Sequence, residues 1–303
     1  MIDFRRKPLS FHVTEGPATF EVDLEAEASD DLQEVMTETF GWLGKHFDMS
    51  RLTTIGHRVV HGGDTFAGPI RIDDAAIEAI DALTVLAPLH QPQSLRLIRA
   101  IRHLRRDLAQ FASFDTAFHR TNAQVVRRFA IPRALHDQGI KRYGFHGLSY
   151  KYIAGKLARC APGAANGKVV IAHLGSGASL CALDAGVSRD TSMGFSTLDG
   201  IPMATRCGAL DPGVLLHLLG PNACSLADVE DILYHKSGLL GASGISADND
   251  PAEPACIVRL DSQNAKGDPS GSPAPISQES VVVGVRNTRF LRLIEQVIPR
   301  LAV

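Results

Sequence analysis

Residues 190–206 read Asp190-Thr-Ser-Met-Gly-Phe-Ser-Thr-Leu-Asp-Gly-Ile-Pro-Met-Ala-Thr-Arg206, and the chain continues Cys-Gly-Ala-Leu-Asp-Pro212. The stretch has almost no regular apolar period, and the Asp-Pro pair after it is typical of a helix start. Small hydroxyl residues and glycines let a backbone approach a ligand closely. An arginine beside them can direct two donors at a carboxylate or a phosphate. Taken alone, the stretch also allows a solvated connection, but four more segments of the same character favour a ligand site.

Strand-like and helix-like segments alternate on both sides of this stretch. The predicted helices are 30–47, a short one capped by Asp73 or Asp74, one around Leu95 to Ile101, 150–157, and one that Ser225 opens with Asp228 three residues later. The predicted strands are 52–60, 111–114 and 169–172. Strands and helices that alternate in this way predict an α/β fold.

The composition is that of an ordinary chain long enough for two domains. Of the 303 residues, 45% are apolar and 21% are charged, and the net charge is −2. This balance offers no basic field for nucleic acid or for an anionic membrane. No apolar run approaches the roughly 20 residues that span a bilayer, and the N-terminus lacks the apolar region of a signal peptide. The five scattered cysteines are typical of buried thiols in a cytoplasmic protein.

Residues 251–284 break the alternation of strands and helices. Five prolines lie there among serine, glycine, asparagine, glutamine and aspartate, and the apolar period is lost. Such a composition is typical of a linker or a disordered stretch. Residues 281–303 combine a valine run with a basic, amphipathic segment, and we expect them to pack weakly.

Polar clusters stand where predicted strands end or helices begin, which is where open α/β sheets bind ligands. Arg58 precedes a His-Gly-Gly turn and either faces a ligand or pairs with a surface acid. Asp115 follows a buried strand, so it either takes part in chemistry or caps a helix. His146 lies between glycines, and both a catalytic and a structural role are open to it. The His-Leu-Gly-Ser-Gly turn at residues 173–177 suits a phosphate but also an ordinary hairpin.

Together these clusters supply two arginines, two histidines, one aspartate and a glycine turn. Arginine and histidine can neutralise the oxygens of a phosphoryl group in transfer, while the turn holds a nucleotide phosphate. The set therefore predicts phosphoryl transfer, although the chain has no Walker-type glycine-lysine loop.

Eight spaced motifs follow one another between about residue 20 and about residue 248. They are Ile55-Gly-His-Arg-Val-Val-His-Gly-Gly63, Ala87-Pro-Leu-His90, Phe114-Asp-Thr-Ala-Phe-His119, Arg142-Tyr-Gly-Phe-His-Gly147, His173-Leu-Gly, Asp190-Thr-Ser-Met-Gly-Phe195, Thr205-Arg206 and Ser237-Gly-Leu-Leu-Gly241. The chain thus resembles the acetate kinase family, of the superfamily that also holds sugar kinases, Hsp70 and actin.

The resemblance implies an α/β fold of two actin-like, or ribonuclease H-like, domains around a cleft, usually in a homodimer. It also implies reversible transfer of the γ-phosphoryl group of ATP to acetate, which forms acetyl phosphate and uses Mg²⁺. Residues 1–118 would be the acyl-substrate domain without its first strand and phosphate loop. Residues 119–250 would be part of the nucleotide-binding domain, and residues 251–303 a linker and a weakly ordered tail.

By the same resemblance, the acyl substrate binds to the first part of the chain. Arg58 would hold its carboxylate, and a small apolar pocket would be lined by Val60, Leu89 and Phe145.

The catalytic residues that the resemblance implies are Asp115, His146 and Arg206. Because a carboxylate nucleophile is already ionised at neutral pH, we expect Asp115 to position groups rather than to remove a proton. His146 and Arg206 would stabilise the in-line transition state. The nucleotide would be bound by His173, Leu174, Gly175, Ser176, Gly177, Asp248, Asn249 and Asp250.

The chain also departs from the family pattern. The family's Asn-rich first loop with its lysine, its Gly-Gly-Ile-Gly-Glu adenosine loop and its late metal-binding glutamate have no match here, so no residue is assigned to a metal. We therefore expect a chain that is incomplete at both ends. Within the match, Tyr150 stands for a usual histidine, Ser176 for an asparagine, Thr197 for a proline and Asp250 for an arginine.

Two interpretations of the chain's function stay open. It is a working carboxylate kinase, or it is an inactive, truncated or frameshifted member that keeps an anion- and acyl-binding face.

Overall fold

The computed structural model describes residues 2–3, 9–15, 18–26, 32–220, 224–247 and 280–285. The chain divides into two compact units, one that ends at Phe114 and one that begins at Asp115. The three expected domain ranges, 1–118, 119–250 and 251–303, remain predictions.

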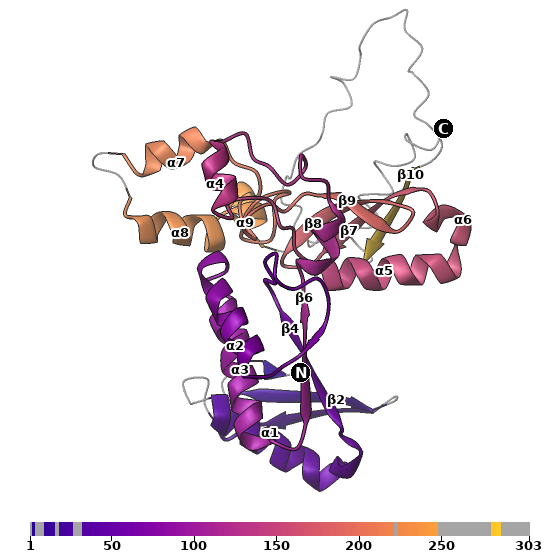
Figure 1. Ribbon diagram of the computed structural model, residues 1–303. Helices are drawn as coiled ribbons and strands as arrows, with labels where there is room; N and C mark the ends of the chain where they lie inside the picture. Colours follow the sequence, from indigo (N-terminus) through magenta and orange to yellow (C-terminus); the bar gives the residue numbers. More distant parts are fainter. Residues whose placement is uncertain are drawn as a thin grey trace, which may run out of the picture. The chain divides into compact units, whose positions relative to one another are not determined.

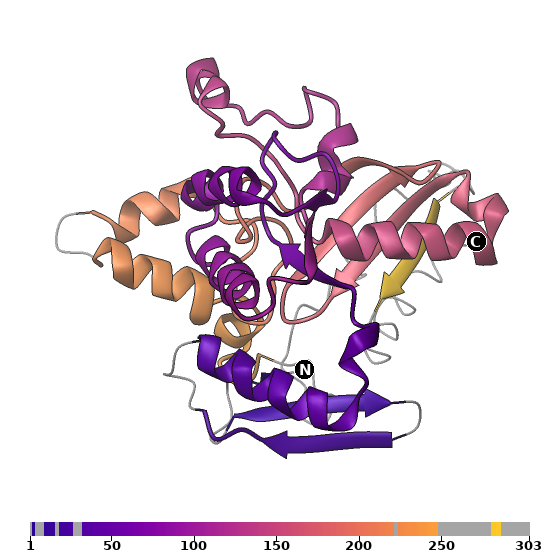
Figure 2. The same cartoon turned by 60° about the horizontal axis from the view of Figure 1, so that its bottom comes forward.

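The first unit opens with an antiparallel sheet that one long helix covers. Its elements are β1 (Ile2–Asp3), β2 (Ser10–Glu15), β3 (Ala18–Asp23), α1 (Leu32–His46) and the 3-10 helix η1 (Met49–Arg51). The strands lie in the order β1-β2-β3, and α1 runs along the two longer strands (Figure 2). Leu9, Leu24 and Val35 form the core between helix and sheet, with Trp42 and Leu43 packed against them.

A second sheet of the first unit carries the predicted acyl-binding segments. Its elements, with the helices around it, are β4 (Thr54–Val59), β5 (Ile70–Arg71), α2 (Asp74–Asp81), η2 (Ala82–Leu86), α3 (Gln91–Leu104) and β6 (Ala109–Phe114). β6 lies between β4, which is parallel to it, and β5, which is antiparallel. Because Val59 pairs with Phe114, β4 and β6 end at the same level. Asp73 caps α2 as predicted, by accepting a hydrogen bond from the amide of Ala76 over 2.8 Å.

The sheet of the second unit is built on β7 (Lys168–Leu174), β8 (Ala178–Asp184) and β9 (Val187–Thr191), which are antiparallel neighbours. Helix α5 (Gly147–Cys160) lies along this sheet (Figure 1). Between them is a core of buried residues, namely Tyr150, Ile153, Val169, Ile171, Cys181 and Leu183. This packing places the start of α5, and with it His146, beside the strand ends.

One prediction about residues 251–284 needs a correction. The end of this predicted linker is a strand, because Ser280–Val285 form β10, which pairs with β7 in a parallel register from Ser280↔Lys168 to Val285↔His173. The expectation that residues 281–303 pack weakly stays a prediction. A run of β-branched valines suits a strand, and β7 offers it an edge. The rest of the predicted linker and tail, residues 251–279 and 286–303, lies outside the described residues.

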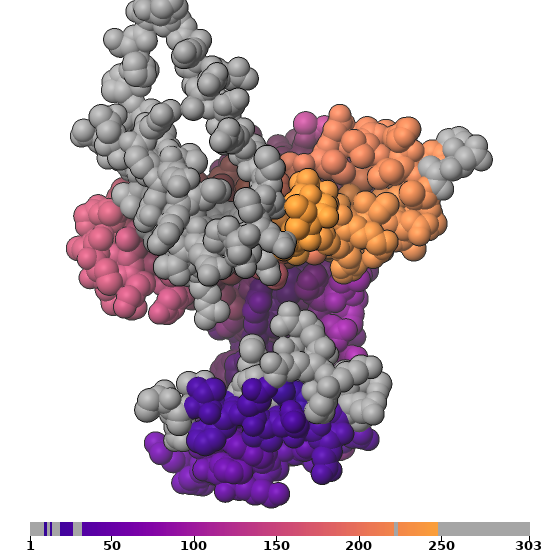
Figure 3. All heavy atoms as spheres, turned by 180° about the vertical axis from the view of Figure 1, so that it is seen from behind, coloured from indigo at the N-terminus to yellow at the C-terminus, as the bar shows by residue number. Residues whose placement is uncertain are grey.

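The other elements of the second unit are short. They are η3 (Ala117–Thr121), α4 (Arg133–Asp137), α6 (Pro162–Ala165), α7 (Pro212–Leu218), α8 (Leu226–His235) and α9 (Gly238–Ser243). The residues of α7, α8 and α9, in orange, gather in one lobe (Figure 3). Asp211 caps α7, and Ser225 and Asp228 form the capping box of α8, as predicted. Residues 192–211 form neither helix nor strand, which agrees with their missing apolar period.

Two general expectations concern membrane spans and the burial of the cysteines. No helix among them is long and apolar enough to cross a membrane. The expectation of buried cysteines is correct for Cys181 but wrong for Cys160, which is exposed at the end of α5.

Candidate functional site

Four of the predicted site residues meet in the second unit, around Gly177. A Cβ built on Gly177 would collide with Nη2 of Arg206 and would lie 3.3 Å from Nε2 of His146. The rings of His146 and His173 stack, with centroids 4.0 Å apart. We call His146, His173, Gly177 and Arg206 the His–Arg cluster. Glycine at position 177 is what lets a guanidinium and an imidazole nitrogen approach the same point.

His146 is held by the backbone on one side and by a hydroxyl on the other. It immediately precedes α5 and has a left-handed conformation, with φ at 59°, which is uncommon for a residue other than glycine. Its Nδ1 lies 2.8 Å from Oγ of Ser179, which in turn lies 2.5 Å from the hydroxyl of Tyr150. Because Ser179 and Tyr150 are fully buried, the ring of His146 has one orientation, with Nε2 toward Gly177.

Arg206 is fixed at its guanidinium and at its backbone. Nη1 donates to the carbonyl of Thr197 over 2.8 Å, and the carbonyl of Arg206 accepts from the amide of Met203 over 3.0 Å. Burial lowers the pKa of the guanidinium, and Tyr234 acts in the opposite direction. An arginine starts from such a high pKa that it still carries its charge at neutral pH.

The Ser-Gly-Leu-Leu-Gly motif holds the turn that carries Arg206. The amides of Ser237, Leu239 and Leu240 donate to the carbonyls of residues 205, 203 and 204 over 3.0, 2.8 and 3.0 Å. Gly238 has φ at +63°, and a Cβ there would meet the Arg206 carbonyl at 2.7 Å. The motif therefore needs its first glycine for this packing.

The predicted phosphate turn at residues 173–177 is hydrogen-bonded to helix α5 and to the segment just before Arg206. Nδ1 of His173 lies 2.9 Å from Oγ of Ser149 in α5, and the carbonyl of Ser176 accepts from the amide of Ala204 over 3.2 Å. The amide of Gly175 donates inside the turn, to the carbonyl of Gly177 over 3.0 Å. The expectation that the turn presents its amides to a phosphate thus does not extend to Gly175.

Asp115 lies buried directly after β6, with 1% of its surface exposed. Its carbonyl accepts from the amide of Gly147 over 2.9 Å, which ties it to the start of α5. The alternative that Asp115 caps the helix after it is wrong, because Thr116 is the N-cap residue of η3 and no side chain makes a cap bond there.

His119 is a buried neighbour of Asp115 that the sequence did not assign a role. Burial lowers its pKa to about 4, although the Phe145 carbonyl and the charges of Asp115 and Asp190 act in the opposite direction. Nε2 lies 2.9 Å from the Phe145 carbonyl, and Nδ1 lies 2.9 Å from Oγ of Ser188. His119 is therefore neutral at neutral pH and fixes the backbone just before His146. Phe145 itself is 1% exposed.

The predicted acyl-binding residues of the first unit lie at the end of β4 and in the segment before α3. Arg58 is the fifth residue of β4 and is exposed, Val60 follows the strand and is half-buried, and Leu89 is 45% exposed. The buried side chain of Gln91 joins the two segments, since its amide donates to the His61 carbonyl over 2.9 Å and its oxygen accepts from the His61 amide over 3.3 Å.

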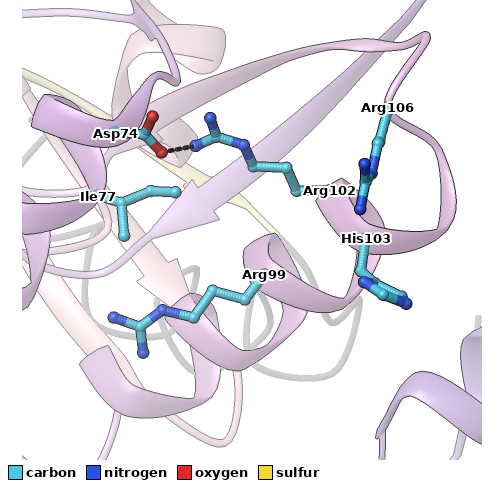
Figure 4. Close-up of a pocket in the computed structure, with 6 residues that line it drawn as sticks. All are labelled: Asp74, Ile77, Arg99, Arg102, His103 and Arg106. Carbon is cyan, nitrogen blue, oxygen red and sulfur yellow. Dashed lines mark ion pairs between the residues drawn. The ribbon is translucent and has the colours of Figure 1, made fainter.

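A separate groove of about 620 Å³ lies between α2 and the end of α3 (Figure 4), and it is lined by Asp74, Ile77, Arg99, Arg102, His103 and Arg106. Arg102 pairs with Asp74 over 2.8 Å, and Arg99 pairs with Asp81 over 2.9 Å. Since acids offset these two arginines and the groove is open, it is a solvated helix face rather than a second candidate site. None of its residues is a predicted site residue.

Asp248, Asn249 and Asp250, expected to contact the nucleotide, lie outside the described residues. Among the residues that the structure does describe, no group of three or more histidine, cysteine, aspartate or glutamate side chains could hold a metal ion.

Sequence reasoning missed the residues that orient the cluster. Ser179 and Tyr150 hold His146, the Thr197 carbonyl holds Arg206, and Gly238 supports the turn of Arg206. Tyr150 and Thr197 did carry a signal, because both differ from the usual residue of the family pattern. Ser179 lies in β8, a strand that the sequence did not predict, and has no motif around it.

Comparisons with known proteins show the family to which the chain is similar. The sequence profile of the acetokinase family matches residues 14–259. Acetate kinase of Rhodopseudomonas palustris strain TIE-1 is 48% identical over 236 residues, which are 78% of this chain and 59% of that protein. Acetate kinase of Rickettsia typhi is 43% identical over 220 residues, which are 72% of this chain and 57% of that protein.

Solved structures are similar as well. A propionate kinase of Francisella tularensis superposes with a TM-score of 0.73 at 35% identity, over 79% of this chain and 61% of that one. Acetate kinase of Porphyromonas gingivalis gives a TM-score of 0.72 at 32% identity, over 80% of this chain and 62% of that one.

These likenesses define an α/β protein with the actin-like fold of the carboxylate kinases, which confirms the predicted fold class. The chain belongs to the acetokinase family. It spans about 59% of the length of the two Rhodopseudomonas palustris acetate kinases that it matches.

Proposed function

We propose that the chain acts in reversible phosphoryl transfer between ATP and acetate, with acetyl phosphate as the product. The observation that carries this proposal is the approach of Arg206 Nη2 and His146 Nε2 to one point beside Gly177, in a member of the acetokinase family. Two nitrogen donors that converge in a partly buried site suit the oxygens of a phosphoryl group in transfer.

The chemistry asks for positioning and for charge neutralisation. Acetate is a nucleophile that is already ionised at neutral pH, so no strong base is needed. Arg206 and His146 donate to the equatorial oxygens of the phosphoryl group, where negative charge is spread in the transition state. The buried carboxylate of Asp115 orients neighbouring donors and does not remove a proton.

The acyl group is assigned to residues of the first unit. Arg58 binds the carboxylate through its forked donors, and Val60 and Leu89 contact the short apolar end. The role that the resemblance implies for Phe145 stays a prediction. Acetate and propionate differ by one methylene, which a hydrophobic pocket distinguishes by about 1–3 kcal/mol. Short carboxylates as a class are therefore the proposed acceptors, with acetate first.

The nucleotide is proposed to bind through the turn at residues 173–177 and through Asp248, Asn249 and Asp250. Members of the family use Mg²⁺ with the nucleotide, but the described residues do not form a metal cluster. Magnesium commonly binds through few protein ligands and the phosphates themselves, so no step here is derived through a metal. A cytoplasmic location, a homodimer, and the absence of nucleic-acid and membrane partners belong to the same proposal.

A second candidate is anion and acyl binding without turnover. It is favoured by the fact that His146, His173, Gly177 and Arg206 all lie in one unit, so a phosphate can bind there through that unit's own contacts.

The test is acetyl phosphate formation from ATP, acetate and Mg²⁺ by the purified chain, beside calorimetric titration of phosphate. Kinase function requires turnover that Arg206→Gln reduces by roughly 10²–10³-fold, the usual cost of one transition-state donor. Arg189→Gln, which changes an exposed arginine of the same unit, should change nothing. Phosphate binding without turnover would support the second candidate. If the wild type shows neither turnover nor phosphate binding, both candidate functions are rejected.

A further inference from the structure

The hydrogen bonds that join Tyr150, Ser179 and His146 have donors and acceptors that can be assigned, because these groups are buried. Tyr150 and Ser179 are both 0% exposed, and their hydroxyl oxygens lie 2.5 Å apart. Oγ of Ser179 also lies 2.8 Å from Nδ1 of His146. Each hydroxyl has a single proton, so the three groups can share their protons in only a few ways.

The hydroxyl proton of Tyr150 decides which of these donor–acceptor arrangements is present. Burial raises the pKa of the phenol far above its usual range, so Tyr150 keeps its proton at neutral pH, and the His173 amide acts on the phenol oxygen as a donor. Among the described residues, Ser179 is the hydrogen-bond acceptor that the structure gives to this hydroxyl. A buried O–H without an acceptor is costly, so Tyr150 donates to Ser179.

The rest of the chain of bonds follows from this step. Since Oγ of Ser179 accepts from Tyr150, its own proton is directed to the other partner, Nδ1 of His146. In neutral histidine one ring nitrogen accepts while the other carries the proton, so that proton is on Nε2. Nε2 is the atom that lies near Arg206 and Gly177.

We propose that Tyr150 is a positioning residue that acts through Ser179 to hold His146 as the Nε2–H tautomer, with that donor directed at the point beside Gly177. A ligand there receives a hydrogen bond from His146 in addition to those from Arg206. With the reverse order of bonds, Nε2 would be an acceptor and would repel an anionic oxygen. The consequence for catalysis rests on the proposed function, but the tautomer itself does not.

Tyr150 is also one of the departures from the family pattern. The pattern has a histidine where this chain has tyrosine, and either side chain offers a donor from the first turns of α5. Tyr152, two residues further along α5, is 65% exposed and serves as the matched control.

The experiment is ring ¹H–¹⁵N correlation NMR of the full chain at a pH where histidine is neutral, with His146 assigned by the signals lost in His146→Gln. The wild type should show protonated Nε2 and unprotonated Nδ1. Tyr150→Phe should give a tautomer mixture with a measurable Nδ1–H fraction and should weaken phosphate binding about three- to tenfold. Tyr152→Phe should match the wild type in both measurements.

Ser179→Ala keeps the proposal testable if Tyr150→Phe does not fold, because it removes the same bond to Nδ1 and should give the same mixture. Where both fold, adding Tyr150→Phe to Ser179→Ala should cause no further loss of phosphate affinity, as expected for groups that act in series. An Nδ1–H signal in the wild type, or an unchanged tautomer in both variants, would overturn the proposal. If the tautomer responds as expected but the wild type transfers no phosphoryl group, the proposed function fails and this inference stands.

Discussion

Gly238 lies directly against the backbone of Arg206: a Cβ at 238 would be 2.7 Å from the Arg206 carbonyl and 3.0 Å from its amide nitrogen. The contact joins the start of α9 to a turn more than 30 residues earlier in the sequence. That turn carries Arg206, the arginine of the His–Arg cluster. This packing accounts for the first glycine of the Ser-Gly-Leu-Leu-Gly motif.

Gly238→Ala should therefore damage both stability and the site. The left-handed φ and the collision with backbone atoms together should lower the free energy of unfolding by roughly 2–3 kcal/mol, and the displaced turn should weaken phosphate binding. Gly155→Ala is the control, because Gly155 has open space around it inside α5 and alanine favours helix by about 1 kcal/mol. Urea unfolding measures both variants, and equal stability of the two would contradict the account of Gly238.

Arg206 and Arg58 should differ in the ligand that each one serves. Arg206→Ala should weaken phosphate binding more than acetate binding, because its guanidinium lies in the His–Arg cluster. Arg58→Ala should do the opposite, since Arg58 is assigned to the carboxylate. Calorimetric titration of phosphate and of acetate into the wild type and both variants gives the comparison. Equal losses for both ligands in both variants would show that the arginines have no separate roles.

The sequence predicted the elements well where one local signal decides them. Asp73 and Ser225 cap helices as expected, and residues 192–211 lack regular structure as expected. Caps and apolar periods act over a few residues, so a single sequence contains them. Strands β8 and β9 were not predicted, because their pairing with β7 depends on partners rather than on local preference.

The sequence predicted the charged and polar groups of the candidate site but not the residues that hold these groups in place. Arg206 and His146 were found from their glycine-rich surroundings. Ser179 was not, because it reaches His146 across 33 residues of sequence, and a lone serine in a strand carries no signal of its partner. For the same reason no pattern indicated that burial would keep His119 neutral.

Acid should destabilise the second unit through His119. Its pKa is about 4 in the folded chain, whereas an unfolded histidine titrates near pH 6.5. Between these values the unfolded state binds the extra proton, so the contribution of His119 is complete above about pH 6.5 and is lost as the pH falls toward 4. The slope is up to about 1.4 kcal/mol per pH unit.

His119→Gln tests this dependence, because glutamine can still donate to the Phe145 carbonyl but does not titrate. The variant should be less stable than the wild type at pH 7, and the difference should shrink between pH 6.5 and 4.5 in urea unfolding. His217→Gln, at an exposed position of α7, should keep the wild-type pH profile. A constant difference between His119→Gln and the wild type across this range would mean that His119 is not the group responsible.

Gln91 should be essential to the first unit, because its fully buried amide bridges three backbone groups. It donates to the His61 carbonyl over 2.9 Å and to the Ile80 carbonyl over 3.2 Å, and it accepts from the His61 amide over 3.3 Å. Gln91→Leu keeps most of the volume but removes all three bonds, and a buried polar group that loses its partner costs about 1–3 kcal/mol. Because these bonds fix the turn that follows Arg58 and Val60, acetate affinity should fall together with the free energy of unfolding.

Gln93→Leu, at an exposed site on the same helix, should change the free energy of unfolding by no more than about 0.5 kcal/mol. If Gln91→Leu unfolds in urea at the same concentration as Gln93→Leu, the bridge does not stabilise this unit.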